Sequence, residues 1–276
     1  MSNVLVYNFI GITMSNHETK VKANHLEIEK SCMKNYEELT EKDLRIQLAA
    51  SYRLVEELGW SFLIFGHLTA RVPGPEKHFL INPYGLMYDE VTASNLVKID
   101  LEGNIVEKSD WDINPAGFII HSAVHSTKNN AHCVMHTHTN AGMAMAALKK
   151  GLINIDFSGS AYHNRVAYHD FEGVTIRKDE CKRIADNLGE KSILVLRNHG
   201  LLTTGGTIAE AFMKLYTLES ACQVQLMARA CDETYEMVPD NIADSHAKDL
   251  KDAASYRLAF RALVRRMLKK DPSFIL

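Results

Sequence analysis

The sequence predicts a single α/β or α+β domain, in which a largely antiparallel sheet is flanked by helices and a helical extension lies at each end. Short apolar segments bounded by Gly, Pro and Asn alternate with longer segments whose apolar residues recur at helical spacing. Neither an internal repeat nor a low-complexity linker divides the 276 residues. We therefore expect one domain over residues 39–235, preceded by a partly ordered arm (1–38) and followed by a C-terminal helical extension (236–276).

The composition is that of a globular protein and argues against several functional classes. Apolar residues make up 46% of the chain and charged residues 24%, which excludes wholesale disorder. The net charge of −3 gives no support to nucleic-acid binding, and no Lys/Arg run exceeds two residues. No stretch approaches the roughly 20 apolar residues that span a bilayer. Five scattered cysteines fit free thiols in a reducing cytosol. We expect a soluble, cytoplasmic protein with no nucleic-acid or membrane partner.

The first half of the domain is predicted to contain one long helix followed by short strands. Thr40 and Asp43 form the pattern of a capping box, and apolar residues then recur at helical spacing until Gly59. Two strands are expected at residues 61–74 and 78–85, and a hairpin at 96–106.

The second half is predicted to be richer in helices. They are expected after Asn114-Pro115, at Ala141–Leu148, at Lys178–Gly189, from Thr207 to about Asp232 and at Asp249–Lys270, with two or three short strands within residues 152–175. On the first of these helices His121 and His125 lie one turn apart. They could form a second metal pair; we favour the interpretation that His121 packs or hydrogen-bonds behind a site and that His125 faces outward.

Three histidines at the ends of apolar segments form a candidate metal site. His136 and His138 are two residues apart, so on a strand both imidazoles lie on one face, about 7 Å apart at the backbone. His199 ends a second apolar segment and is followed at once by Gly200. A catalytic zinc typically takes three protein ligands and keeps one position open. The alternatives are a chance His-x-His pair and a simple turn at Asn198-His199-Gly200.

Five motifs, taken in order, resemble those of the class II aldolase/adducin family: Gly66-His-Leu-Thr-Ala-Arg, Ile81-Asn-Pro-Tyr-Gly, Pro115-Ala-Gly-Phe, His136-Thr-His-Thr and Arg197-Asn-His-Gly-Leu-Leu. The resemblance covers about residues 40–235. It implies a three-layer αβα fold with a central mixed sheet, and a C4 homotetramer with the active site at a subunit interface. It also implies that His136, His138 and His199 hold a divalent metal, which we expect to be Zn²⁺, with Mn²⁺, Fe²⁺ or Co²⁺ as alternatives.

The sequence departs from the sugar-phosphate aldolases of this family at their acid/base and phosphate sites. Counting back from His136, the position of their catalytic Glu is Gly117, and the positions of their phosphate-binding residues are His67 and Pro115-Ala116. A non-phosphorylated substrate is therefore expected. The Pro-Ala-Gly-Phe version is similar to adducin heads and to a bacterial subgroup that includes metal-dependent decarboxylases.

Together these features predict a metal-dependent carbon–carbon lyase. We expect it to cleave a small hydroxy- or keto-carboxylate, by decarboxylation or retro-aldol reaction, through a metal-stabilised enolate. The alternatives are a sugar-phosphate aldolase or epimerase with a relocated base, and a non-catalytic, adducin-like oligomerisation module. The catalytic candidate is His67, for which satisfaction by local backbone is the alternative. Substrate contacts are expected from Gly66, Tyr84, Arg71 and His163, with Arg197 as a further candidate for holding a carboxylate.

Overall fold

A seven-stranded mixed sheet forms the centre of the molecule. The computed structural model describes residues 21–175, 177–250 and 253–276. The strand order is β3-β2-β1-β4-β7-β6-β5, in which β5 and β6 are parallel and the other pairs are antiparallel. The strands are β1 (His67–Arg71), β2 (Phe79–Ile81), β3 (Val97–Ile99), β4 (Cys133–Thr137), β5 (Val166–His169), β6 (Ile193–Leu196) and β7 (Gly200–Gly205).

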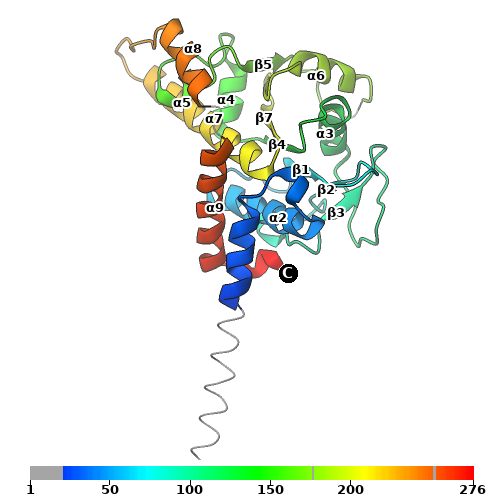
Figure 1. The fold of residues 1–276 in the computed structure, drawn as a ribbon. Coiled ribbons are helices and arrows are strands. Elements are labelled where there is room, and N and C mark those ends of the chain that lie inside the picture. Colours follow the sequence, from blue (N-terminus) through cyan, green and yellow to red (C-terminus); the bar gives the residue numbers. More distant parts are fainter. Residues whose placement is uncertain (1–20, 176, 251–252) are drawn as a thin grey trace, which may run out of the picture.

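Helices cover both faces of the sheet, as Figure 1 shows. One face carries α3 (Pro115–Thr127) and α6 (Glu180–Leu188), and the other carries α2 (Glu41–Glu57), α4 (Asn140–Ala147) and α7 (Ile208–Arg229). Side chains of a strand alternate between faces, so Val134 of β4 packs with α3 and α6 whereas Cys133 and Met135 pack with α2 and α7. The predicted single domain with a three-layer α/β architecture is confirmed.

The start of α2 shows how local sequence fixes an element. Thr40 Oγ1 accepts a hydrogen bond from Asp43 N at 3.1 Å, and Thr40 N donates to the Asp43 carboxylate at 3.1 Å. This reciprocal capping satisfies two main-chain donors that the helix leaves unpaired. Leu44 and Leu48, on the apolar face of the helix, are buried in the core. The predicted helix is thus correct in its start and its buried face.

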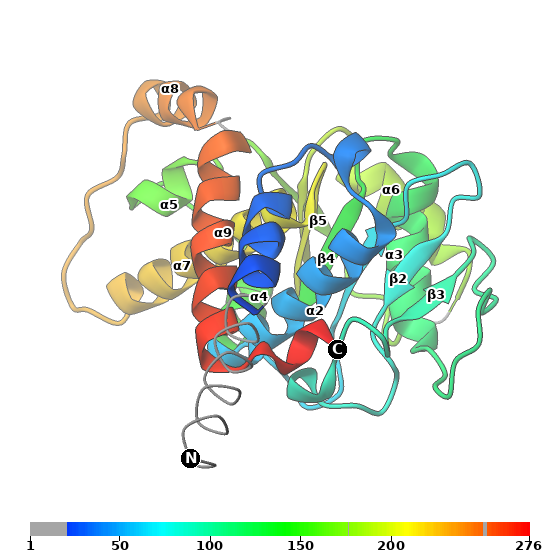
Figure 2. The ribbon, with the colours of Figure 1, turned by 60° about the horizontal axis from the view of Figure 1, so that its bottom comes forward.

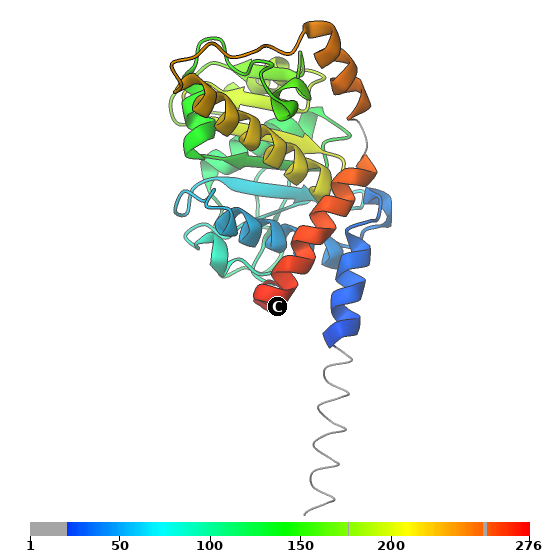
Figure 3. The ribbon, with the colours of Figure 1, turned by 90° about the vertical axis from the view of Figure 1, so that its left-hand side faces the viewer.

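The C-terminal segment is helical and folds back on the domain. It comprises α8 (Asp240–Asp249), α9 (Ala253–Lys270) and the 3₁₀ turn η3 (Pro272–Ile275). Helix α9 lies beside the helical residues 21–31 (Figures 2 and 3), and both Arg261 and Arg265 form ion pairs with Glu29, at 3.1 and 3.2 Å. Residues 1–20 of the predicted arm lie outside the described residues. No helix of the described residues is long and apolar enough to cross a bilayer.

Two predicted strand regions were partly wrong. The strand expected at 61–74 is shortened to β1, because residues before Gly66 form a tight turn in which Leu63 has φ +52°. Within 152–175 there is one strand, β5, instead of two or three. The preceding residues form the short helix α5 (Phe157–Ser160), because the Asp156 carboxylate accepts from the main-chain N–H groups of Ser158 and Gly159.

Candidate functional site

The pairing of β4 with β7 brings the three candidate metal ligands together. His136 lies near the end of β4, and His138 follows that strand just before α4. His199 lies in the turn between β6 and β7. In the β4–β7 register His136 is opposite Leu202, so the turn that carries His199 lies next to the end of β4. Segments 61 residues apart in the chain therefore place their histidines over one point.

The geometry of the three imidazoles fits a divalent metal. The Nε2 atoms of His136 and His138 are 2.8 Å apart, and those of His138 and His199 are 3.0 Å apart. Zn–N bonds of roughly 2.0–2.1 Å in a tetrahedral site place ligand nitrogens about 3.3 Å from one another. Within the described part of the chain this is the one group of three or more His, Cys, Asp or Glu whose ligand atoms all lie within 4.8 Å. Imidazoles alone suit Zn²⁺ and several other transition metals.

The surroundings of the triplet keep its Nε2 lone pairs free. His136 Nδ1 donates a hydrogen bond to the carbonyl oxygen of Leu201 at 2.9 Å, which assigns the ring proton to Nδ1 and leaves Nε2 as the donor atom for a metal. Burial lowers the pKa of His136 well below its usual value, and burial with the neighbouring His199 lowers the pKa of His138 to about 4. Burial also lowers the pKa of His199, so all three rings are suited to the neutral form that binds metals.

Gly200 is required by the approach of these rings. A Cβ at this position would lie 2.4 Å from the carbonyl oxygen of Thr137, 3.2 Å from His138 Cδ2 and 3.3 Å from His136 Cε1. Any side chain would therefore push the start of β7 away from the end of β4, next to the three ligands. The glycine after His199 reflects this close packing, and not only the turn.

His67 lies beside the triplet, on the same face of the sheet. It is opposite His136 in the β1–β4 register, and the centroids of the two rings are 5.0 Å apart. Its Nδ1 is 2.8 Å from His121 Nε2. A Cβ on Gly117 would lie 2.6 Å from His67 Cδ2, so the imidazole fills the space that a side chain at position 117 would enter.

The prediction for His121 is confirmed, and that for His125 is wrong. His121 is buried and hydrogen-bonds behind His67. His125 also faces inward and is only 3% exposed. Its Nε2 is 2.8 Å from Thr69 Oγ1, and its ring stacks on Phe79. The sequence spacing placed both histidines on one face of α3 but did not show that β1 offers that face a polar partner.

The residues expected to contact substrate are more widely spread. Gly66 adopts φ +84° at the start of β1, where a Cβ would lie 2.7 Å from the Tyr88 hydroxyl. Tyr84 is 37% exposed and lies in the loop after β2. Arg71 donates to the carbonyl oxygen of His125. No described contact joins Tyr84 or Arg71 to the triplet.

His163 and Arg197 have partners elsewhere. His163 hydrogen-bonds to Asn154, and its Nε2 lies 3.8 Å from the carboxylates of both Asp240 and Asp244 on α8. Arg197 donates to the carbonyl oxygen of Leu148 at 2.6 Å and lies over the ring of Tyr168. Arg197 therefore ties the end of α4 to the strand that precedes His199.

Two residues at the site were missed by sequence reasoning. The ring of Phe62 is 5.9 Å from that of His138, in an edge-on arrangement, and the side chain is 45% exposed. Thr69 lies between His121 and His125. The signal for Thr69 was available, because it shares the strand face of His67 by the two-residue alternation. Nothing local distinguishes Phe62 from an ordinary core residue.

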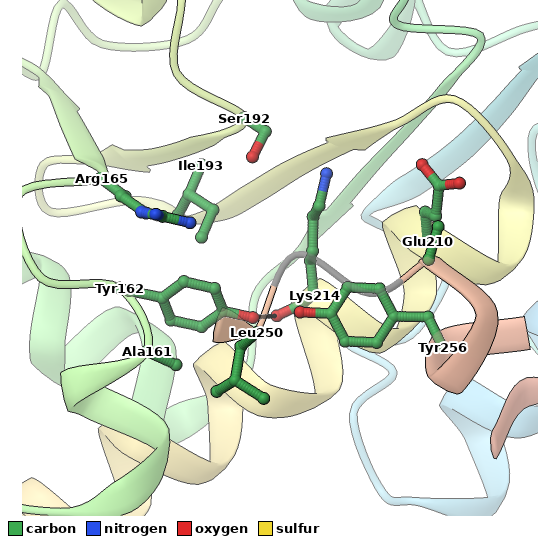
Figure 4. Close-up of a pocket in the computed structure, with 10 residues that line it drawn as sticks. Ala161, Tyr162, Arg165, Ser192, Ile193, Glu210, Lys214, Leu250 and Tyr256 are labelled. Atoms are coloured by element: carbon green, nitrogen blue, oxygen red, sulfur yellow. Dashed lines mark hydrogen bonds between the residues drawn. The ribbon is translucent and has the colours of Figure 1, made fainter. Parts of the chain in front are cut away.

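A cavity of about 340 Å³ lies away from the triplet, between the domain and the C-terminal helices (Figure 4). Its polar lining includes Tyr162, Arg165, Glu210, Lys214 and Tyr256. The Lys214 ammonium donates to the carbonyl oxygen of Thr204, and Tyr162 Oη donates to the carbonyl oxygen of Lys214. None of the three candidate metal ligands lines this cavity.

Known proteins share both the fold and much of the sequence. Residues 46–226 match the family model described as Class II Aldolase and Adducin N-terminal domain. The crystal structure of an aldolase II superfamily protein from Pseudomonas syringae is similar with a TM-score of 0.82 and 39% identity, over 86% of this chain and 96% of that one. An L-fuculose 1-phosphate aldolase from Glaciozyma antarctica has a TM-score of 0.75 and 29% identity, over 84% of this chain and 92% of that one. Alpha-adducin from Rattus norvegicus is 46% identical over 69% of this chain and 26% of that protein.

Proposed function

The chain belongs to the class II aldolase and adducin N-terminal domain family, and from this membership we propose that it is a metal-dependent carbon–carbon lyase. The observation that carries the proposal is the convergence of three Nε2 atoms beside a fourth, buried histidine. The resemblance inferred from the sequence motifs is confirmed by the family match. The reaction, the substrate and the metal belong to the proposal.

His136, His138 and His199 would hold the metal, which we propose to be Zn²⁺. When bound, a divalent metal supplies positive charge that binds a carboxylate or carbonyl oxygen and stabilises the negative charge that develops as a carbon–carbon bond breaks. The protein's part is to fix the rings, through the Leu201 carbonyl on His136 and the close packing of Gly200 against Thr137 and His138 at the end of β4.

His67 would move the proton that the reaction requires. Cleavage leaves a carbanion equivalent that must gain a proton, or a hydroxyl that must lose one, and His67 Nε2 is the ring nitrogen not engaged by His121. Its imidazole occupies the space next to Gly117, the position at which sugar-phosphate aldolases of this family carry their catalytic Glu by resemblance. The base has thus moved from the helix to the strand that faces it.

We propose a small, non-phosphorylated hydroxy- or keto-carboxylate as the substrate. His67 is buried between β1 and α3, at a position where the phosphate-binding members carry an Asn, and Pro115-Ala116 replace their Ser pair. Arg71 and Arg197 donate to the main-chain carbonyls of His125 and Leu148, and no described contact joins either side chain to the triplet. In both decarboxylation and retro-aldol cleavage a negative charge develops on the carbon whose bond breaks, so the proposal includes both reactions.

The test is release of CO₂ or aldehyde from a panel of small hydroxy- and keto-carboxylates and their phosphorylated counterparts, using zinc-loaded protein. We expect turnover of at least one non-phosphorylated carboxylate, lost on chelation. His67→Ala should retain stoichiometric zinc and lose about 10²–10⁴-fold in turnover. His246→Ala is the matched control, because His246 hydrogen-bonds to Ser160 and no described contact joins it to His67 or to the triplet. Unchanged turnover in His67→Ala would remove His67 from the mechanism.

Two other outcomes would replace the proposal. Turnover of phosphorylated ketoses but not of their free forms would indicate a sugar-phosphate aldolase or epimerase, as the L-fuculose 1-phosphate aldolase relative is named. A folded protein that binds no metal would indicate an adducin-like oligomerisation module, in line with the 46% identity to alpha-adducin. We also propose a homotetramer, which light scattering after size-exclusion chromatography would measure.

A further inference from the structure

We propose that His121, Thr69 and His125 are positioning residues that keep the proton of His67 on Nδ1 and leave its Nε2 as a free acceptor. This inference rests on the proposed function only in giving His67 a proton to move. It concerns the position of a proton within the neutral rings, and it can be measured without any substrate.

The four residues form a continuous buried chain of hydrogen bonds between β1 and α3. His67 Nδ1 is 2.8 Å from His121 Nε2, His121 Nδ1 contacts Thr69 Oγ1, and Thr69 Oγ1 is 2.8 Å from His125 Nε2. The chain ends at His125 Nδ1, which is 3.0 Å from the carbonyl oxygen of Ala131. Along this series of hydrogen bonds, residues of β1 (His67, Thr69) alternate with residues one turn apart on α3 (His121, His125).

The terminal carbonyl fixes the direction of every bond. A carbonyl oxygen can only accept, so His125 must carry its proton on Nδ1 and present a lone pair at Nε2. Thr69 must then donate its single hydroxyl proton to His125 and accept from His121 Nδ1. His121 Nε2 is left with a lone pair, to which His67 Nδ1 donates. Each of the four hydrogen bonds then contains one proton, and the unprotonated nitrogen of His67 is Nε2.

The opposite arrangement would require either a buried positive charge or a broken hydrogen bond. If His67 carried its proton on Nε2, His121 would have to donate at both nitrogens and become an imidazolium, or two lone pairs would face each other at one of the four contacts. His121 and His125 are almost fully buried, and the Arg71 guanidinium next to His125 further disfavours a positive charge there. Burial lowers the pKa of His121 well below its usual value, and burial together with Arg71 lowers that of His125 to about 3. The neutral chain is therefore the favoured one, and its direction follows from the Ala131 carbonyl.

The consequence for the reaction is that His67 Nε2 is always able to accept a proton from the substrate. In a retro-aldol cleavage Nε2 takes the hydroxyl proton of the substrate while Nδ1–H continues to donate to His121, and the same proton returns from Nε2 to the carbanion in the next step. No proton has to travel along the chain. Removing the Thr69 hydroxyl leaves His121 without the acceptor that fixes its proton, so both tautomers of His121, and through it of His67, become accessible.

The experiment uses full-length, zinc-loaded protein with ¹⁵N-labelled histidine and two-dimensional spectra that separate protonated from unprotonated ring nitrogens. We expect His67, assigned by comparison with His67→Ala, to be protonated on Nδ1. Thr69→Val should produce a mixture of tautomers at His67 and lower turnover about 10–100-fold, the loss typical for removal of an orienting partner. Thr69→Ser, which keeps the hydroxyl, should restore both. Thr203→Val is the control, because its buried hydroxyl donates to the Ala211 carbonyl outside the chain.

The outcomes separate this inference from the proposed function. A proton on Nε2 in the unmodified protein, or the same tautomer in Thr69→Val and the unmodified protein, would overturn the inference whatever the activity. The expected tautomer pattern in a protein that turns over none of the panel substrates would support the inference and count against the proposed function.

Discussion

Replacing Gly117 by Ala tests whether the space at this position belongs to His67. The new Cβ would lie 2.6 Å from His67 Cδ2 and 2.9 Å from Cγ, whereas carbon atoms pack at about 3.5–4.0 Å. The ring must therefore move by roughly 1 Å, away from a partner that holds its Nδ1 at 2.8 Å. A misplacement of that size typically costs about 10²-fold in rate.

The effect on stability is the balance of two terms. Overpacking a buried site costs about 1–3 kcal/mol, and exchange of Gly for Ala within a helix returns up to about 1 kcal/mol. We therefore expect Gly117→Ala to lower the free energy of unfolding by about 1 kcal/mol while the zinc content stays unchanged.

A double-mutant cycle identifies the cause of this change. Urea unfolding and steady-state turnover would be measured for Gly117→Ala, His67→Ala and the double variant. In the His67→Ala background the clash is absent, so Gly117→Ala should become neutral or stabilising. Unchanged turnover in Gly117→Ala, or the same destabilisation with and without His67, would refute the assignment of this space to the imidazole.

Two further predictions concern the ligands and the buried histidines. Gly200→Ala should weaken zinc binding by about 10–100-fold, because its Cβ would lie 2.4 Å from the Thr137 carbonyl oxygen. Competition with a chromogenic chelator measures the zinc affinity. An unchanged affinity would contradict the argument from the packing of Gly200. The free energy of unfolding should fall as the pH drops below about 6.5, since the unfolded chain binds a proton that His125, with its pKa lowered to about 3, does not. The free energy of unfolding falls by about 1.4 kcal/mol per pH unit for each such histidine. Above about pH 6.5 this contribution to stability is fully present. His125→Asn should reduce this slope in urea titrations between pH 7 and 5, and an identical slope in both proteins would refute it.

Local sequence rules located the elements that depend on neighbouring residues. The Thr40–Asp43 capping box requires only residues within one turn, and the start of α2 was predicted correctly. The same holds for the long helix after Thr207. Within 152–175 only β5 formed of the two or three predicted strands, because Asp156 caps a short helix, a local bond that competes with apolar periodicity.

The candidate site depends on long-range pairing, which the sequence shows only in part. The two-residue spacing of His136 and His138 placed both rings on one strand face, and a second apolar segment ending in His199 indicated the third ligand. The inward position of His125 depends instead on Thr69, which is 56 residues away in the chain. No periodicity within α3 carries that information.

The space around Gly117 shows the same distinction. The resemblance to the family placed Gly117 where a catalytic Glu was expected, but only the fold shows that the ring of His67 fills the space next to this glycine.

Metal content per chain is the most direct test of a metal-dependent lyase. Protein purified without chelators would be analysed by elemental mass spectrometry beside a His136→Ala/His138→Ala variant. We predict about one divalent metal ion per chain, mainly zinc, in the unmodified protein and almost none in the variant. Metal absent from both proteins, or present equally in both, would contradict the assignment of the three histidines and the function proposed from it.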